Sequence, residues 1–157
     1  MPGEVDFMRE AAKLAAIGMQ AGDGGPFGAV VVKDNTIIGR GWNRVIVSND
    51  PTAHAEVTAI RDACKTLGTF QLDGCEIYTT CEPCPMCLGA IYWARPEKVY
   101  FSSNRHDAAA IGFDDQFIYD EINLPFETRN IPLVWQECIE AKALFTEWKN
   151  IENKTMY

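Results

Sequence analysis

Basic residues are scarce in this chain, which has 14 lysines and arginines against 22 aspartates and glutamates. The resulting formal net charge of -8 argues against a protein that binds bulk DNA, RNA or an anionic membrane. Contacts to phosphate groups need clustered cations, which this composition makes hard to assemble. A small, uncharged or cationic substrate fits the charge better.

Long apolar runs and the basic start of an export signal are missing as well. No stretch approaches the roughly eighteen apolar residues of a membrane-spanning helix, and residues 1–6 contain acidic side chains but no basic one. There are no internal repeats, low-complexity tracts or linkers. We therefore expect one soluble, cytoplasmic domain over residues 1–157, long enough to bury roughly two-thirds of its unfolded surface.

Cysteine, in contrast, is plentiful and unevenly placed. Three of the six cysteines stand at intervals of three residues, at Cys81, Cys84 and Cys87. The other three are scattered among apolar segments and are predicted to be small buried hydrophobes. Because a chain of this size does not need disulfides to hold a core, the cluster indicates metal binding.

The apolar pattern predicts helices that alternate with short strands. Helices are expected near residues 4–20, 52–67, 85–95, 116–122 and 141–148, and strands near 27–33, 36–42, 75–79, 98–101 and 131–135. The turn pair Asp34 and Asn35 joins the first two strands as an antiparallel hairpin. We therefore expect an α/β fold of three layers, α/β/α, with helices on both faces of a mixed five-stranded sheet.

Two short segments, 51–56 and 81–87, contain the residues with the clearest chemistry. Cys84 and Cys87 stand three apart at the start of a predicted helix, so their sulfurs share one face and can bind the same ion. His54 lies at the start of another predicted helix, and helices that flank one sheet can bring their N-termini together. Both helix dipoles favour thiolate over thiol. These three side chains predict a zinc site.

The predicted ligand set is that of a catalytic zinc. One imidazole and two thiolates leave the fourth position of a tetrahedral ion open to water, and binding lowers the pKa of that water from about 16 towards roughly 7. Glu56 follows His54 by two residues in the first helical turn, where it can face the water and accept its proton. We therefore expect hydrolytic catalysis.

The signature His-x-Glu, followed about 28 residues later by Pro-Cys-x-x-Cys, is that of the zinc-dependent nucleobase and nucleoside deaminases. Four longer segments extend the likeness: GGPFGAVVVKD, SNDPTAHAEVTAIR, CEPCPMCLGAIYWARP and GFDDQFIY, starting at residues 24, 48, 81 and 112. Over nearly the whole chain, the sequence resembles the short bacterial guanine deaminases of the cytidine deaminase superfamily. The resemblance implies a cytidine deaminase-like fold and zinc-dependent deamination of guanine to xanthine and ammonia in purine catabolism or salvage.

The resemblance also implies a role for each matching residue. One zinc ion per subunit, with a bound water, would be held by His54, Cys84 and Cys87, while Glu56 would transfer protons and Asp115 would act near the expelled amino group. The implied substrate-binding residues are Asn43, Phe27, Ala55, Trp93 and Tyr157. Family members of this type form homodimers that exchange the C-terminal segment, here about residues 140–157.

Other interpretations of the same residues stay open. Cys81 extends the cysteine run as in iron–sulfur ferredoxins, but Ile91 stands where a fourth cysteine is expected. Cys81 could instead complete a structural zinc module that mediates protein association, which would leave Glu56 without a role. Among the deaminases, guanosine, cytosine and a tRNA adenosine are alternative substrates, and the last would need a basic face on a chain with net charge -8.

Overall fold

The computed structural model describes residues 6–157, so the expected helix start at residues 4 and 5 lies outside the described part. The elements are α1 (Phe7–Gln20), β1 (Gly28–Lys33), β2 (Thr36–Trp42), α2 (Val45–Ser48), α3 (Ala55–Leu67), β3 (Cys75–Cys81), α4 (Pro85–Ala94), β4 (Lys98–Ser103), α5 (Arg105–Ala110), α6 (Gln116–Ile122), the 3-10 helix η1 (Phe126–Thr128) and α7 (Ile139–Asn150). The expected helices and the first four expected strands are present, with ends that differ by a few residues. The short helices α2, α5 and η1 occupy stretches that the sequence pattern left without an element.

The sheet is mixed, as predicted, but it has four strands in the order β2-β1-β3-β4. β1 runs antiparallel to both β2 and β3, and β3 runs parallel to β4. Asp34 and Asn35 form the tight turn of the β1–β2 hairpin with φ angles of 47° and 60°. This left-handed backbone is the one that a two-residue hairpin turn favours, and Asn and Asp tolerate it.

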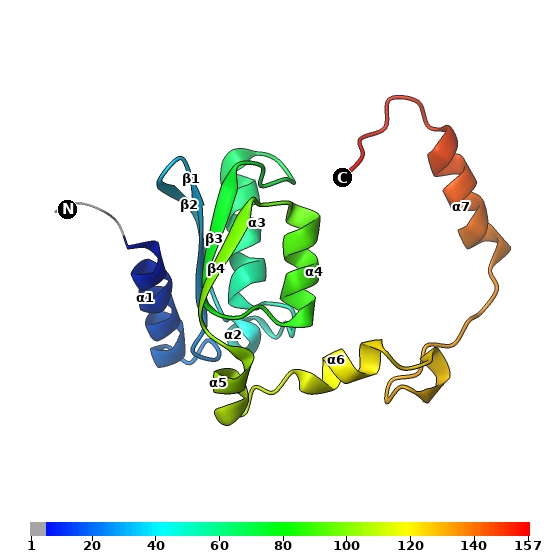
Figure 1. The fold of residues 1–157 in the computed structure, drawn as a ribbon. Coiled ribbons are helices and arrows are strands. Elements are labelled where there is room, and N and C mark those ends of the chain that lie inside the picture. Colours follow the sequence, from blue (N-terminus) through cyan, green and yellow to red (C-terminus); the bar gives the residue numbers. More distant parts are fainter. Residues whose placement is uncertain (1–5) are drawn as a thin grey trace. The chain divides into compact units, whose positions relative to one another are not determined.

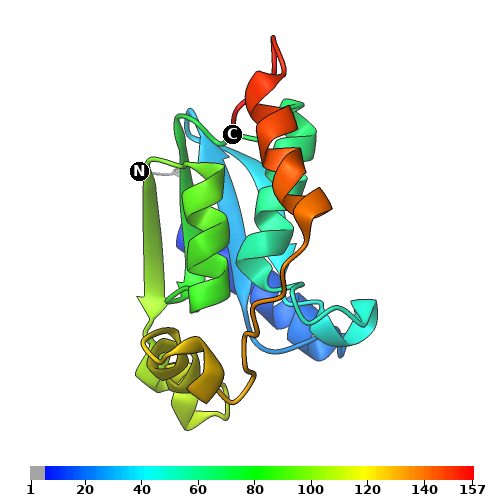
Figure 2. The same cartoon turned by 90° about the vertical axis from the view of Figure 1, so that its right-hand side faces the viewer.

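Helices cover both faces of the sheet because the side chains of β1 alternate between two apolar clusters. Val30 and Val32 pack with residues of α1, whereas Ala29 and Val31 point to the other face and pack with residues of α3 and α4. Figure 1 shows α1 on one side of the sheet and α3 with α4 on the other, and Figure 2 shows α3 and α4 side by side. The result is the expected order of three layers.

Two glycines of β2 let α3 lie very close to the sheet. A Cβ atom at Gly41 would come closer than 2.5 Å to the backbone oxygen of Ala55 and the backbone nitrogen of Ala59. A Cβ atom at Gly39 would lie 2.6 Å from the Cβ atom of Ala63. The three alanines of α3 are fully buried against this strand. The N-terminal turn of α3 is therefore placed by direct contact with the end of β2.

The chain divides into two compact units, Met1–Asp115 and Gln116–Tyr157. The second unit contains α6, η1 and α7 but no strand at residues 131–135, so the expected fifth strand is wrong. In this segment Ile131, Val134 and Trp135 are 83%, 81% and 82% exposed. β-branched and aromatic residues form a strand when a partner strand and a buried face are available. Here the backbone N–H of Leu133 donates to the carbonyl of Phe126 at 3.1 Å, which closes a loop and does not pair two strands.

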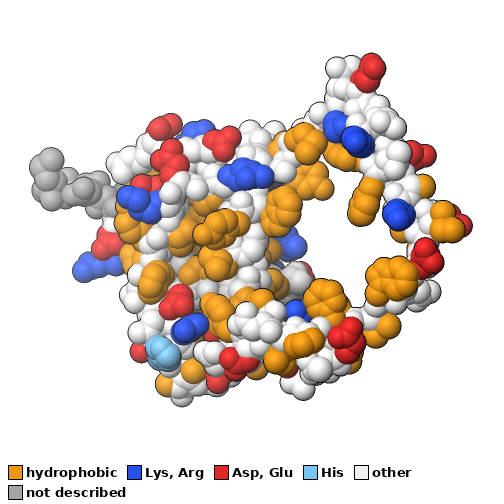
Figure 3. All heavy atoms as spheres, turned by 45° about the vertical axis from the view of Figure 1, so that its right-hand side comes forward, with side chains coloured by type: hydrophobic (Ala, Val, Ile, Leu, Met, Phe, Trp, Pro, Cys, Tyr) orange, Lys and Arg blue, Asp and Glu red, His pale blue; other side chains and the backbone are white. Residues whose placement is uncertain are grey.

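The second unit has an apolar surface, and Figure 3 shows hydrophobic side chains open to view on one face of the molecule. Phe145 and Trp148 of α7, for example, are 80% and 43% exposed. Apolar patches of this kind mark surfaces that bind a partner. In residues 6–157, no helix combines the length and the apolar character that crossing a membrane requires.

Candidate active site

The starts of two neighbouring helices bring the predicted metal ligands together. His54 is the N-cap of α3 and Cys84 is the N-cap of α4. Pro85 takes the first position of α4, where its missing N–H is one that a helix start leaves unpaired in any case. The Cys84 sulfur accepts the backbone N–H of Cys87 at 3.5 Å. This cap bond holds both sulfurs on the side of α4 that faces His54.

The three side chains have the spacing of a tetrahedral zinc site. His54 Nδ1 lies 3.5 Å from Cys84 Sγ and 3.5 Å from Cys87 Sγ. Zinc–nitrogen and zinc–sulfur bonds of about 2.1 and 2.3 Å at a tetrahedral angle would place the two atoms about 3.6 Å apart. Among the residues from 6 onward, these three are the group of His, Cys and acidic side chains that could hold a metal ion. The donor set therefore fits zinc, with one position not filled by this group.

The electrostatics of the site favour a thiolate. The hydrogen bond with Cys87 and, second to it, the one with His54 lower the pKa of Cys84 from 9.0 to about 4. The same sulfur raises the pKa of His54, chiefly through the hydrogen bond between them. All six cysteines are free thiols rather than disulfides. The hydrogen bond between Cys84 and Cys87 raises the pKa of Cys87, so one of the two sulfurs is a thiolate and the other keeps its proton until a cation displaces it.

Glu56 lies beside the ligands but is not one of them. It stands in the first turn of α3, is 6% exposed, and interacts with the Cys87 side chain and with the charges of His54 and Cys84. Burial raises the pKa of its carboxyl above the usual 4.5, and hydrogen bonds offset part of this effect. A carboxyl with a raised pKa exchanges its proton more readily near neutral pH, which suits general acid–base catalysis.

Asn43 is held tightly at the end of β2. It is 6% exposed, its backbone N–H donates to the carbonyl of Phe27 at 3.0 Å, and its Oδ1 accepts the backbone N–H of Val45 at 3.1 Å. Gly24 lies against it so closely that a Cβ atom there would overlap Asn43 Oδ1. These contacts fix the side-chain amide in one orientation.

Phe27 forms an aromatic pair with a residue that the sequence analysis did not single out. Its ring lies edge-on to that of Phe113, with centroids 5.0 Å apart and an interplanar angle of 85°. Phe27 also packs on the core cluster beneath α3. Phe113 stands two residues before Asp115. The sequence feature that could have identified Phe113 is its position as an aromatic residue inside the GFDDQFIY segment.

Asp115 and Cys81 share the surroundings of the site. Burial raises the pKa of the Asp115 carboxyl above its usual 3.8, and the Cys84 thiolate adds to the shift. Burial, followed by the charges of Glu56 and other carboxylates, raises the pKa of Cys81 from 9.0 to about 11. The Cys81 thiol lies 3.8 Å from the carbonyl of Asn104 and does not belong to the three-ligand group. It is a neutral neighbour of the site.

The remaining predicted residues lie in different places. Ala55 follows His54 as the first residue of α3 and is fully buried. Trp93 is 63% exposed and stands six residues after Cys87 on α4, a rise of roughly 9 Å along the helix. Tyr157 belongs to the second unit and is 66% exposed. Ala55 thus lies next to His54 in the first turn of α3, whereas Trp93 lies toward the end of α4 that is far from Cys84 and Cys87.

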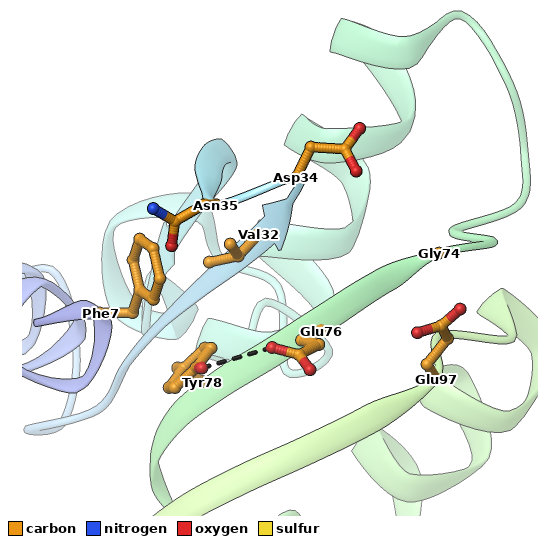
Figure 4. A pocket seen from close by; sticks show the side chains of 8 residues that line it. All are labelled: Phe7, Val32, Asp34, Asn35, Gly74, Glu76, Tyr78 and Glu97. Atoms are coloured by element: carbon orange, nitrogen blue, oxygen red, sulfur yellow. Dashed lines mark hydrogen bonds between the residues drawn. The ribbon is translucent and has the colours of Figure 1, made fainter. Parts of the chain in front are cut away.

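A pocket of about 260 Å³ lies elsewhere on the first unit (Figure 4). It is lined by Phe7, Val32, Asp34, Asn35, Gly74, Glu76, Tyr78 and Glu97. The Tyr78 hydroxyl donates to the Glu76 carboxylate at 3.3 Å across its wall. Neither the metal ligands nor the predicted substrate-binding residues line it, so this pocket is not the active site.

Comparisons with known proteins agree with the geometry. The sequence model of the family described as "Cytidine and deoxycytidylate deaminase zinc-binding region" matches residues 2–103, which include all three ligands and Glu56. The chain is 58% identical to the guanine deaminase of Bacillus subtilis (strain 168) over 96% of this chain and 97% of that one. An X-ray structure of guanine deaminase from Bacillus subtilis superimposes with a TM-score of 0.94 at 57% identity, covering 100% of this chain and 99% of the other.

A relative whose name gives another substrate is also similar. The tRNA-specific adenosine deaminase of Aquifex aeolicus (strain VF5) is 45% identical over 96% of this chain and 97% of that one. These three comparisons cover 96%, 100% and 96% of this chain, so the similarity extends over both units.

Proposed function

The chain belongs to the cytidine and deoxycytidylate deaminase family, and we propose that it hydrolyses guanine to xanthine and ammonia in purine catabolism or salvage. The observation that carries the proposal is the group of His54, Cys84 and Cys87 with the buried Glu56 beside it. The 58% identity to a guanine deaminase favours guanine over the substrates of other members.

Glu56 performs the proton transfers of the proposed reaction. Zinc, when held by His54, Cys84 and Cys87, lowers the pKa of a water molecule towards about 7 and so supplies a nucleophile at neutral pH. Glu56 accepts the proton from this water and delivers it to a ring nitrogen of guanine as the C–O bond forms at C2. It then takes the proton of the new C2 hydroxyl group and delivers it to the amino group, so the C2–oxygen bond becomes a carbonyl while the C–N bond breaks and ammonia leaves. Its burial suits this cycle because its raised pKa lets it both gain and lose the proton.

Three further residues support binding of a purine. Asn43 uses Oδ1 to accept the Val45 N–H, so the amide Nδ2 is the donor that it offers to a ring nitrogen or carbonyl of guanine. Ala55 begins α3, where backbone N–H groups lack partners within the helix. The Asp115 carboxylate accepts hydrogen bonds, which matches the N–H and amino donors of guanine. Phe27 supplies an apolar wall beside Asn43.

The alternatives differ from this proposal in charge and coordination. A tRNA substrate would need basic residues along a face, and the net charge of -8 leaves few to provide one. A structural zinc module would need a fourth protein ligand, but within residues 6–157 the candidate group holds three side chains and excludes Cys81. Guanosine differs from guanine only by a ribose on N9 and is the nearest competing substrate.

We also propose that the functional form is a homodimer in which residues of about 140–157 are exchanged between subunits. The support is the apolar surface of the second unit, which a partner would cover. Trp93 and Tyr157, both largely exposed in one copy, would then line and close the pocket of the assembled dimer. Light scattering of the purified protein tests this, since a monomer at micromolar concentration would contradict it.

The free thiols support a reducing, cytoplasmic location.

Ammonia release from guanine, guanosine, adenine and cytosine tests the function directly. We expect turnover with guanine and one zinc per chain by plasma mass spectrometry. Substitution of His54 by alanine should abolish both the turnover and the zinc binding. Cys81→Ser is the matched control for a cysteine outside the ligand group and should keep zinc and activity. Faster turnover of guanosine would change the substrate, and loss of zinc from Cys81→Ser would favour the structural module.

A further inference from the structure

Asp23, in the loop after α1, holds the two residues that flank Asn43. Its Oδ2 accepts the indole N–H of Trp42 at 2.8 Å and lies 3.9 Å from Nη1 of Arg44. The guanidinium of Arg44 in turn lies over the Trp42 ring, 5.2 Å from its centroid. Trp42, Asn43 and Arg44 are consecutive, so one carboxylate anchors the chain on both sides of Asn43.

The backbone of Asp23 reinforces this anchor. Its carbonyl accepts the N–H groups of Ile46 and Val47 at 3.0 and 3.1 Å, and its own N–H donates to the carbonyl of Gly18 at 3.0 Å. The segment after Asn43 is therefore tied to the end of α1 by main-chain bonds that do not depend on the Asp23 side chain. The side chain of Asp23 additionally holds the side chains of Trp42 and Arg44 in place.

The same segment is connected to the metal ligands. The backbone N–H of Arg44 donates to the carbonyl of Ala53 at 2.9 Å, and Ala53 directly precedes His54. The Asp23 carboxylate is thus connected to His54 through the 3.9 Å ion pair with Arg44 and the hydrogen bond from Arg44 to Ala53, and Asn43 directly precedes Arg44. A shift of Trp42 or Arg44 would change the position of the Asn43 amide relative to the metal.

From these contacts we propose that Asp23 is a positioning residue, which sets the Asn43 amide at its working distance from the metal ligands. The inference rests on the proposed function, in which Asn43 binds the purine. The hydrogen bond to Trp42 is the main element of this role, because a partly exposed ion pair at 3.9 Å contributes little by itself. A charged acceptor on a partly buried N–H is a stronger bond.

Steady-state kinetics of Asp23→Ala with guanine test the proposal. We expect KM to rise roughly tenfold, with a smaller fall in kcat, because a charged hydrogen bond of this kind holds the purine-binding group. Zinc content should stay at the wild-type value. Asp23→Asn keeps an oxygen acceptor for the Trp42 N–H and should restore KM to within about threefold of wild type.

Asp62→Ala is the matched control. Asp62 also accepts a bond from β2, the backbone N–H of Arg40 at 2.8 Å, but it does so from α3 and at a residue two positions before Trp42. Its loss should lower the melting temperature and leave KM unchanged. An equal rise in KM in this control would overturn the proposal, since it would show that any weakening of β2 has the same effect.

A double-mutant cycle shows whether Asp23 acts through Asn43. In an Asn43→Ala background, Asp23→Ala should change KM no further, whereas independent structural effects would add. Gly18→Ala gives a separate approach, because its Cβ atom would lie 2.9 Å from Trp42 Cγ and displace the indole from Asp23. It should raise KM as Asp23→Ala does.

The outcomes separate the two proposals. If the wild-type protein turns over guanine but Asp23→Ala has the wild-type KM, only the proposed role of Asp23 is overturned. The same holds if the effects of the two substitutions add in the double-mutant cycle. Wild-type protein that releases no ammonia from guanine overturns the proposed function and this inference with it.

Discussion

Replacing Gly41 with alanine should damage the active site more than it damages the fold. The new Cβ atom would come closer than 2.5 Å to backbone atoms of Ala55 and Ala59, and 3.0 Å from the Cα atom of Ala59. Ordinary van der Waals contact begins at 3.4 Å. Backbone atoms cannot rotate away as a side chain can, so the first turn of α3 must move from β2 by roughly 1 Å.

This turn carries the proposed acid–base group. Glu56 lies within it and His54 caps it, whereas Cys84 and Cys87 belong to α4 and would stay in place. A misplacement of about 1 Å between reacting groups can cost roughly 100-fold in rate. We therefore expect kcat for guanine to fall about 100-fold, while unfolding stability falls by about 1–3 kcal/mol, the usual effect of forcing a methyl group into a packed interface.

Gly39→Ala is the matched control because it adds the same methyl group to the same strand. Its Cβ atom would lie 2.6 Å from the Cβ atom of Ala63 and 2.7 Å from the backbone oxygen of Ala59, farther along α3 from the site. Thermal unfolding, zinc content and ammonia release should be measured for both variants. A similar loss of stability in both with a much larger loss of kcat in Gly41→Ala is the expected result. Equal kcat in the two variants would refute the argument.

Three further predictions concern charged groups. Glu56→Gln should keep zinc, lower kcat by about 100- to 10,000-fold, and raise the melting temperature because a buried charge is removed; normal ammonia release would end its assignment as the acid–base group. After zinc removal by a chelator, iodoacetamide at pH 6 should label Cys84, whose pKa is about 4, and spare Cys81, whose pKa is about 11; mass spectrometry showing the reverse order would contradict the site electrostatics. Hydrogen bonds from Thr52 lower the pKa of Asp50 below 3.8, so its contribution to stability is full above that pH and is lost as the pH falls through the lower folded-state value. Asp50→Asn should therefore lower the melting temperature at pH 7 but not well below pH 3.8, and a difference that is independent of pH would exclude this role.

Two of the three candidate metal ligands could be predicted from the sequence because their relative geometry is local. Cys84 and Cys87 are related by one helical turn, and Pro85 fixes where that turn begins. His54 required one further assumption, that two helix starts meet at one end of the sheet, and the 3.5 Å distances from its Nδ1 to both sulfurs agree with it. Glu56 followed from its place in the same turn as His54.

Features that depend on distant segments could not be predicted in the same way. The segment at residues 131–135 has strand-forming side chains, but a strand exists only where another chain segment pairs with it, and composition does not show that. The contact of Asp23 with Trp42 joins the loop before β1 to the last residue of β2, and no short motif marks it. The close contact between β2 and α3 could not be predicted for the same reason. Gly41 and the alanines that it contacts are distant in sequence, and nothing in either segment alone indicates that they pack together.

The charge around the site links its geometry to the choice of substrate. With zinc bound, the sulfurs of Cys84 and Cys87 would both be thiolates, and the carboxyls of Glu56 and Asp115, which interact with the Cys84 charge, would add to this negative charge. Burial raises the pKa of both carboxyls. A divalent cation and the positive ends of two helix dipoles, each equivalent to about half a charge, offset most of this negative charge. A phosphate-bearing nucleotide or RNA strand would bring further negative charge to a chain whose net charge is already -8. A neutral base or nucleoside meets no such repulsion, so the electrostatics favour guanine or guanosine over a nucleotide, and contacts to the ribose position must distinguish between those two.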